Sequence, residues 1–274
     1  MNSIPEILEI EGSSKCNGKC TFCRIGQGFK RPSGKMTIEL FTKIIKDATD
    51  LEIKRIFPSL ADEPFLSSRI FERLQILREH GRETVVYTNG SLLTPDKADQ
   101  LVEFSDVVKE IIINAAGIDE ESHQRIQGLS FEQVKQNVEY LAQINNKRIP
   151  VYVHTPRMEA NIEFLEQWKE TWRGIVTSAQ VTSFCNWGGH IRDKYELQSK
   201  RSYCLALDRM VVAWDGVVSI CFTDLERNAI IGDLNQQTIL EVYNSPEALH
   251  YRKMHKMGRM SELALCMNCN VTAF

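Results

Sequence analysis

The stretch Cys16-Asn17-Gly18-Lys19-Cys20-Thr21-Phe22-Cys23 places three thiols within eight residues. It follows a short apolar run, Ile7, Leu8 and Ile10, that is typical of a buried strand. Three cysteines cannot form two disulfides, and no nearby residue supplies the fourth ligand of a tetrahedral zinc site. A four-iron cluster bound by three thiolates leaves one iron open for another molecule. The spacing therefore favours an iron–sulfur cluster over a disulfide pair or a zinc site.

Composition and charge are those of a globular chain with a substantial core. The 274 residues are 43% hydrophobic and 25% charged, and the formal net charge of −3 is spread over both halves. This predicts neither a nucleic-acid track nor a membrane-surface patch. No apolar run approaches the roughly 18 residues of a spanning helix, and the N-terminus lacks the pattern of a signal peptide. Eight cysteines without an export signal favour a reducing compartment, so we expect a soluble, cytoplasmic enzyme.

Strand-like and helix-like segments alternate six times up to residue 184. The expected strands cover 7–11, 53–60, 84–88, 107–114, 149–154 and 175–184. The expected helices begin after the N-cap Thr37, at Ser67, at Thr94-Pro95, at Phe131 and at Ile162. This alternation predicts an α/β fold with parallel strands joined by right-handed crossovers. A doubly wound sheet and an incomplete (β/α) barrel both satisfy the pattern.

The pattern changes after about residue 200. Asp215-Gly216 between two apolar runs, 210–214 and 217–222, predicts a β-hairpin, and short helices are expected near 239–243 and 246–257. This part of the chain contains four further cysteines, Cys204, Cys221, Cys266 and Cys269. Four thiolates can saturate a second four-iron cluster or a structural zinc ion. Cys185 is then the one unassigned cysteine.

The CxxxCxxC spacing, with the aromatic Phe22 before the last thiol, resembles the signature of the radical S-adenosylmethionine (SAM) family. The resemblance implies that residues 1–195 form a six-stranded partial TIM barrel and that Cys16, Cys20 and Cys23 hold a [4Fe–4S] cluster. It further implies that SAM chelates the open iron and is cleaved to a 5′-deoxyadenosyl radical. Active sites of such barrels lie at the carboxyl ends of the strands.

Short motifs after successive strands resemble the SAM-binding positions of this family. Ala61-Asp62-Glu63 follows the second strand, where relatives have a Gly-x-Glu-Pro-like motif that binds the SAM amino group; here Ala61 replaces the glycine. Asn89 also suits a simple turn, and His154 also suits a structural role. His123–Gly128 is interpreted as a structural loop. The resemblance implies a SAM-contacting set of Phe22, Ala61, Asp62, Glu63, Asn89, Asn114 and His154.

The second group of cysteines resembles the twitch auxiliary domain, a short relative of the SPASM domain. The resemblance implies that residues 196–274 form a small hairpin-and-helix domain around a second [4Fe–4S] cluster. The implied ligands are Cys204, Cys221, Cys266 and Cys269. Because the four thiolates would saturate this cluster, electron relay is its expected role, with a zinc site as the alternative.

The resemblance extends to aminocyclitol dehydrogenases and aminoglycoside epimerases. We expect no leader-binding module before the first strand, and therefore a small polar substrate that is sugar- or cyclitol-like. Trp187 stands where such dehydrogenases have arginine in a related Asn-Arg-Gly-Gly. We therefore expect epimerisation, with Cys185 as the hydrogen-atom donor. The alternatives are two-electron dehydrogenation of an alcohol, peptide modification, and a zinc-stabilised binding module without enzymatic activity. The resemblance also implies a flavodoxin- or ferredoxin-type electron donor, and we expect no nucleic-acid or membrane partner.

Overall fold

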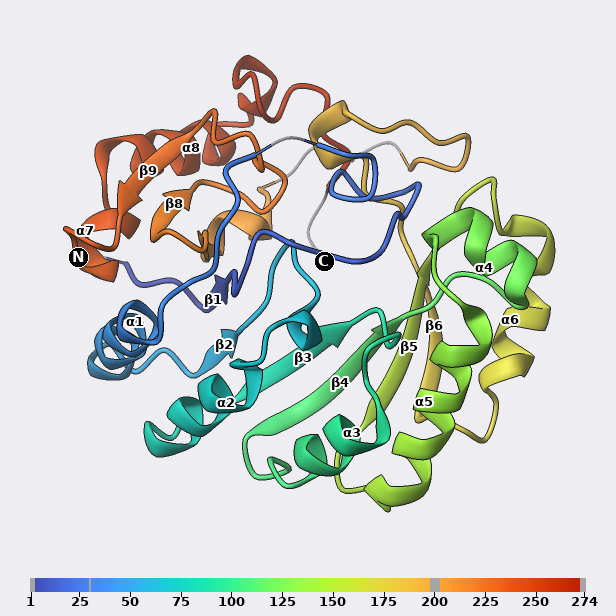
Figure 1. Cartoon of the computed structure of the whole chain (residues 1–274). Helices are drawn as coiled ribbons and strands as arrows, with labels where there is room; N and C mark the ends of the chain where they lie inside the picture. The colour runs from blue at the N-terminus through green and yellow to red at the C-terminus, as the bar shows by residue number, and fades with distance from the viewer. Residues whose placement is uncertain (1–2, 30, 198–202, 272–274) are drawn as a thin grey trace.

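The computed structural model describes residues 3–29, 31–197 and 203–271 (Figure 1). Its centre is a row of six parallel strands in chain order. An isolated parallel bridge between Arg55 and Glu83 joins the second strand to the third. The sixth strand ends its sheet, so the barrel is open on that side. The expected partial (β/α)6 barrel is confirmed. Its strands are β1 (Ile7–Ile10), β2 (Arg55–Phe57), β3 (Thr84–Thr88), β4 (Val108–Asn114), β5 (Val151–Pro156) and β6 (Ser178–Thr182).

Six α-helices surround these strands on their outer face (Figure 1). They are α1 (Ile38–Asp50), α2 (Ile70–Glu79), α3 (Pro95–Val102), α4 (Glu120–Gln127), α5 (Phe131–Asn145) and α6 (Leu165–Trp172). Leu8 and Ile10 of β1 are fully buried in one apolar core with Phe41 and Ile45 of α1. Because side chains alternate along a strand, Glu9, which lies between Leu8 and Ile10, faces the barrel interior. The Thr37 side chain accepts a hydrogen bond from the Leu40 N–H, so the predicted N-cap is confirmed.

The interpretation of His123–Gly128 as a loop is wrong. These residues lie in and directly after α4, which begins at a capping box formed by Asp119 and Ser122. Gly128 ends the helix in the left-handed region at φ 65°. The sequence therefore contained an N-cap signal and a C-terminal glycine. The helix between them is only two turns long, so its periodicity is weak.

The C-terminal part continues the barrel sheet. It contains β7 (Arg209–Val212), β8 (Val217–Ser219), β9 (Ile230–Asp233), α7 (Ile239–Tyr243) and α8 (Pro246–Lys256). Strands β7 and β8 form the predicted hairpin, and β9, which was not predicted, adds a third antiparallel strand. Since β7 also pairs in parallel with β1, one sheet has the order β2-β1-β7-β8-β9. The domain boundary near residue 195 stays a prediction, because this sheet crosses it.

Short 3₁₀ helices complete the described chain. They are η1 (Pro64–Leu66), η2 (Ile162–Phe164), η3 (Trp187–Gly189), η4 (Leu205–Asp208) and η5 (Met260–Glu262). Two of them lie beside predicted site residues, η1 after Glu63 and η3 after Cys185. No helix within the described residues is both long enough and apolar enough to cross a membrane.

Candidate functional site

The three cysteines of the CxxxCxxC stretch lie in the loop between β1 and α1, and each is partly exposed. The end of α4 holds this loop in place through two backbone hydrogen bonds. The Lys19 N–H donates to the Gln127 carbonyl at 2.7 Å, and the Thr21 N–H donates to the Ile126 carbonyl at 2.9 Å. A helix more than a hundred residues away in the chain therefore sets the conformation of the cysteine loop.

Hydrogen-bond donors surround the sulfur atoms of this loop. The Gly18 N–H lies 3.4 Å from the Cys16 Sγ, and the Asn89 Nδ2 lies 3.8 Å from it. The Gln127 side chain is fixed beside this loop by accepting from the Ala116 N–H at 2.5 Å and donating to the Asn114 carbonyl at 3.0 Å. Burial raises the pKa of Cys16 to about 11, so an incoming iron must displace the thiol proton. Donors directed at sulfur suit thiolate ligands of a cluster, and the loop fits a cluster held by Cys16, Cys20 and Cys23.

Glu63 is buried between the ends of β2 and β3. Its carboxylate accepts hydrogen bonds from the Thr88 hydroxyl at 2.7 Å, the Asn89 N–H at 2.8 Å and the Phe65 N–H at 3.2 Å. Asn89 in turn donates to the Asn17 side chain at 2.9 Å. The structure therefore brings Glu63 and Asn89 together beside the cysteine loop and makes Glu63 a positioning residue for Asn89. Direct contact of either residue with SAM stays a prediction.

Ala61 and Asp62 lie next to a buried ion pair that the sequence analysis missed. The Arg31 guanidinium donates to the Ala61 carbonyl at 3.0 Å and pairs with the Glu11 carboxylate at 2.5 Å. The Asp62 carboxylate accepts from two backbone N–H groups at 3.0 and 3.1 Å. Burial raises the pKa of both carboxyl groups, Glu11 and Asp62, to about 7. The charged groups of this motif are therefore already paired or hydrogen-bonded within the protein.

Asn114 is the last residue of β4, and His154, two residues before the end of β5, is its register partner. The His154 ring is half-buried, hydrogen-bonds Gln180 of β6 and lies 6.4 Å from the Tyr152 ring centroid. Burial lowers the pKa of His154, so its imidazole is neutral at pH 7. The structure thus places both residues at the carboxyl end of the barrel, as predicted, and their contacts with SAM stay predictions.

The opposite side of the barrel interior carries a second ion pair. The Glu9 carboxylate of β1 accepts from the Arg209 guanidinium of β7 at 2.5 Å, and Glu9 is almost fully buried. Tyr87 of β3 lies close enough for both charges to act on its hydroxyl, and its ring contacts Phe57 at 5.7 Å between centroids. The interior of this barrel therefore presents charged and hydroxyl groups rather than a continuous apolar wall.

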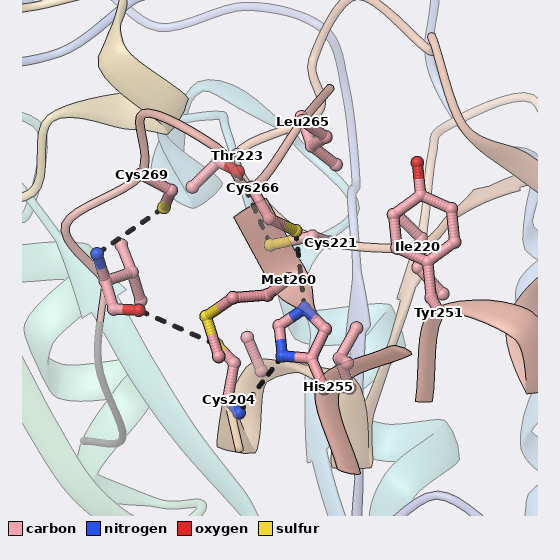
Figure 2. A pocket seen from close by; sticks show the side chains of 13 residues that line it. Cys204, Ile220, Cys221, Thr223, Tyr251, His255, Met260, Leu265, Cys266 and Cys269 are labelled. Carbon is pink, nitrogen blue, oxygen red and sulfur yellow. Dashed lines mark hydrogen bonds between the residues drawn. The ribbon is translucent and has the colours of Figure 1, made fainter. Parts of the chain in front are cut away.

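Cys204, Cys221, Cys266 and Cys269 line one cavity beneath the C-terminal hairpin (Figure 2). They come from three separated parts of the chain, before β7, after β8 and in the C-terminal tail. Among the described residues, no three histidine, cysteine or carboxylate side chains are placed to hold a single metal ion. Four sulfur donors around a shared cavity provide one ligand for each iron of a four-iron cluster. The remaining walls of the cavity are largely apolar and include Ala206, Leu207, Ile220, Met260 and Leu265.

The loop after β6 connects the barrel to this cavity. The fully buried Asn186 side chain donates to the Asn268 carbonyl at 2.8 Å and accepts from the Asn270 N–H at 3.1 Å. Asn270 reciprocates by donating to the Phe184 carbonyl at 2.7 Å. The segment that carries Cys269 is therefore fixed to the barrel by hydrogen bonds that span more than eighty residues of sequence.

Cys185 and Trp187 lie in the same loop. Burial raises the pKa of Cys185 to about 12, with smaller contributions from the thiolates of Cys269, Cys23 and Cys204. Cys185 directly precedes Asn186, whose side chain is hydrogen-bonded to the segment that carries Cys269. The Trp187 indole N–H donates to the Phe22 carbonyl at 2.8 Å, so this side chain braces the cysteine loop. Phe22 itself packs beside a small apolar cluster next to Trp187.

Three contributors to the site were missed by sequence reasoning, namely Gln127, Arg31 and His255. Gln127 and Arg31 hold the cysteine loop and the SAM-binding motif, and His255 lies in the four-cysteine cavity. The CxxxCxxC spacing says nothing of these residues, because their contacts join segments that are distant in the chain. A helix signal at Asp119–Gly128 was the one clue to Gln127.

Comparisons with known proteins agree with this geometry. The chain matches the sequence model of the Radical SAM superfamily over residues 10–166 and that of SPASM, an iron–sulfur cluster-binding domain, over residues 204–270. It is 22% identical to the S-adenosyl-L-methionine-dependent 2-deoxy-scyllo-inosamine dehydrogenase of Niallia circulans, with 98% of this chain and 94% of that protein covered.

Solved structures share the fold. The crystal structure of BtrN in complex with AdoMet and 2-DOIA has a TM-score of 0.73 at 20% identity, covering 98% of this chain and 94% of that one. SuiB of Streptococcus suis bound to its precursor peptide SuiA has a TM-score of 0.76 at 15% identity, covering 98% of this chain and 70% of that one. Together with the two domain matches, these structures confirm the partial barrel with its C-terminal auxiliary part.

The same matches establish the cofactors and the class of enzyme. A Radical SAM domain followed by a SPASM domain uses SAM and [4Fe–4S] clusters, in agreement with the prediction. The first match alone covers more than half of the chain. This protein therefore belongs to the radical SAM superfamily.

Proposed function

We propose that this protein oxidises one alcohol group of a small aminocyclitol- or sugar-like substrate to a ketone. The observation that carries the proposal is the similarity to 2-deoxy-scyllo-inosamine dehydrogenase, which covers nearly the whole of both chains. The proposal reverses the preference of the sequence analysis, which favoured epimerisation because Trp187 replaces an arginine.

The reaction requires the removal of one hydrogen atom, one proton and one electron from the carbinol. Bound SAM and its cluster supply the 5′-deoxyadenosyl radical that takes the hydrogen atom, and the auxiliary cluster supplies an acceptor for the electron. We propose Cys16, Cys20 and Cys23 as ligands of the first cluster, and Cys204, Cys221, Cys266 and Cys269 as ligands of the second. A flavodoxin- or ferredoxin-type protein is the proposed electron donor.

The barrel interior supports a small polar substrate. The partly exposed Tyr87 side chain offers a hydroxyl to the ring hydroxyls of a substrate, and the Glu9–Arg209 pair near it makes this part of the interior polar. The neutral His154 on β5 is the proposed acceptor of the proton, since Trp187 donates its only N–H to the Phe22 carbonyl and has no basic group.

The decisive experiment is anaerobic turnover of the reconstituted protein with SAM, a reductant and 2-deoxy-scyllo-inosamine as the probe substrate. We expect one ketone for each 5′-deoxyadenosine, and deuterium transfer into 5′-deoxyadenosine from a substrate deuterated at the oxidised carbon. A C16A/C20A/C23A triple variant serves as the control that cannot cleave SAM. Formation of 5′-deoxyadenosine without any ketone would contradict the proposed oxidation.

Epimerisation is the second candidate, because a specific thiol supports it. Cys185 directly precedes Asn186, whose side chain holds the segment that carries Cys269, and at neutral pH its raised pKa keeps it in the thiol form that a hydrogen-atom donor needs. Turnover in deuterated water separates the two candidates. A stereoisomer of the substrate with solvent deuterium at the reacting carbon, lost in Cys185→Ala, would favour epimerisation. Ketone formation that is unchanged in Cys185→Ala would favour oxidation.

A further inference from the structure

His255 lies in the last turn of α8, inside the cavity formed by Cys204, Cys221, Cys266 and Cys269 (Figure 2). Its side chain is only 4% exposed. The proposed oxidation gives this imidazole no role. The inference below rests on the assignment of the four cysteines to the auxiliary cluster.

Two contacts determine which ring nitrogen carries the proton. The Cys204 backbone N–H donates to the His255 Nδ1 at 3.4 Å, so Nδ1 acts as the acceptor. A neutral imidazole with an unprotonated Nδ1 carries its hydrogen on Nε2. That Nε2 lies 3.4 Å from the Cys266 Sγ. The Tyr203 ring packs edge-on against the imidazole, at 6.2 Å between centroids and 82° between planes, and holds its orientation.

We propose that the His255 Nε2–H donates a hydrogen bond to the Cys266 thiolate of the auxiliary cluster and raises its reduction potential. The physical reason is that reduction adds negative charge to the cluster and its thiolates, and a donor aimed at sulfur stabilises that charge. The electron released when the substrate radical becomes a ketone then has a more favourable acceptor. His255 is a positioning and tuning residue, since it touches a ligand and not the substrate.

Among the four cysteines of the cavity, the His255 imidazole contacts the sulfur of Cys266. The Cys221 Sγ has the Thr223 hydroxyl as its hydrogen-bond partner, at 3.4 Å from Oγ1. Cys269 accepts from the Val271 N–H at 3.4 Å. The partner of the Cys266 sulfur is the His255 imidazole, a side chain that can be replaced without changing the backbone. This makes the contribution of one hydrogen bond to the potential measurable.

The test uses the full chain in the C16A/C20A/C23A background, in which the auxiliary cluster is the one cluster left to titrate. The midpoint potential is followed by electron paramagnetic resonance during reductive titration of four variants, His255→Phe, His255→Asn, His255→Gln and the control His250→Asn. Glutamine can place an N–H near the position of Nε2, whereas the shorter asparagine amide reaches only the position of Nδ1. The exposed His250 lies on the same helix.

We expect a lower midpoint potential in His255→Phe and His255→Asn, a value near that of the parent in His255→Gln, and no change in His250→Asn. An unchanged potential in both His255→Phe and His255→Asn, with iron still near four per chain, would overturn the inference. Loss of iron in His255→Gln would overturn it as well, because the imidazole would then hold the cavity together or bind iron. The absence of a second cluster in the parent background would instead refute the proposed cluster ligands.

In the chain with both clusters, we expect His255→Phe to form 5′-deoxyadenosine at the normal rate and ketone more slowly. A shifted potential without ketone formation in any variant would leave the role of His255 intact and refute the proposed oxidation. The two proposals therefore fail in distinguishable ways.

Discussion

Replacement of Asn186 by alanine is expected to separate the C-terminal cysteine tail from the barrel. The Asn186 side chain is fully buried and makes four hydrogen bonds. It donates to the Glu196 carboxylate at 2.6 Å and the Asn268 carbonyl at 2.8 Å, and it accepts from the Gly189 and Asn270 N–H groups at 3.1 Å each. Alanine retains none of these contacts.

The magnitude follows from the two backbone groups that lose their partner, the Asn268 carbonyl and the Asn270 N–H, since the Gly189 N–H also donates to the Asn186 backbone carbonyl at 3.1 Å. A neutral hydrogen bond contributes about 1 kcal/mol net, and a buried group left without a partner costs about 1–3 kcal/mol. The substitution should therefore lower the free energy of unfolding by about 2–4 kcal/mol. Because Cys269 lies between these two groups, we also expect iron to fall from about eight toward about four atoms per chain.

The assay compares Asn186→Ala with Asn268→Ala. Asn268 is exposed and contributes its backbone carbonyl, which alanine keeps, so this control should behave like the unmodified protein. Urea unfolding, iron analysis and hydrogen exchange at the Asn270 amide report on the same connection. If both variants unfold at the same urea concentration and retain equal iron, the reasoning is refuted.

Three further substitutions test separate parts of the site. Gly189→Ala should lose auxiliary iron, measured by iron analysis and spin quantification, because φ is 93° and the added Cβ would lie 2.6 Å from the Cβ of a tail residue. Glu63→Gln should raise the KM for SAM roughly tenfold, because one of the two oxygens that accept from the Thr88 hydroxyl and the Asn89 N–H becomes an NH2 group, which cannot accept; an unchanged KM would contradict this. Arg31→Ala should destabilise the protein by about 3–5 kcal/mol, because it leaves the Glu11 carboxylate buried without its partner. The pKa of Glu11 is raised to about 7 from 4.5, so the folded state binds the proton more tightly than the unfolded chain and stability falls as pH rises between these values. Without the Arg31 cation the pKa of Glu11 should rise further, so the loss of stability with increasing pH should continue above pH 7. Urea unfolding at about pH 6 and about pH 8 measures this loss.

The sequence by itself determined the class of the protein and most of its elements. The CxxxCxxC spacing specifies a local loop with three thiols, and local chemistry of this kind is readable without the fold. The alternation of strands and helices likewise depends on periodicity within each segment, so six strands were predicted at their places along the chain. Their arrangement as an open barrel was implied by the family resemblance and is confirmed by the sheet order. The short helix α4 and the strand β9 were missed, because two turns or four residues carry little periodicity.

The tertiary structure decided which residues contact the cysteines or hold the segments that carry them. Gln127 reaches the cysteine loop, Asn186 holds the C-terminal tail, and His255 faces Cys266, each across a long interval of sequence or from another element. Such contacts depend on how crossovers bring strand ends and loops to the same edge of the barrel, and residue types carry no record of that arrangement. The buried pair Glu11–Arg31 illustrates the same reason, since burial and partner are properties of the packed chain. The spacing of the cysteines predicts which thiols bind iron, whereas packing determined which side chains surround those thiols.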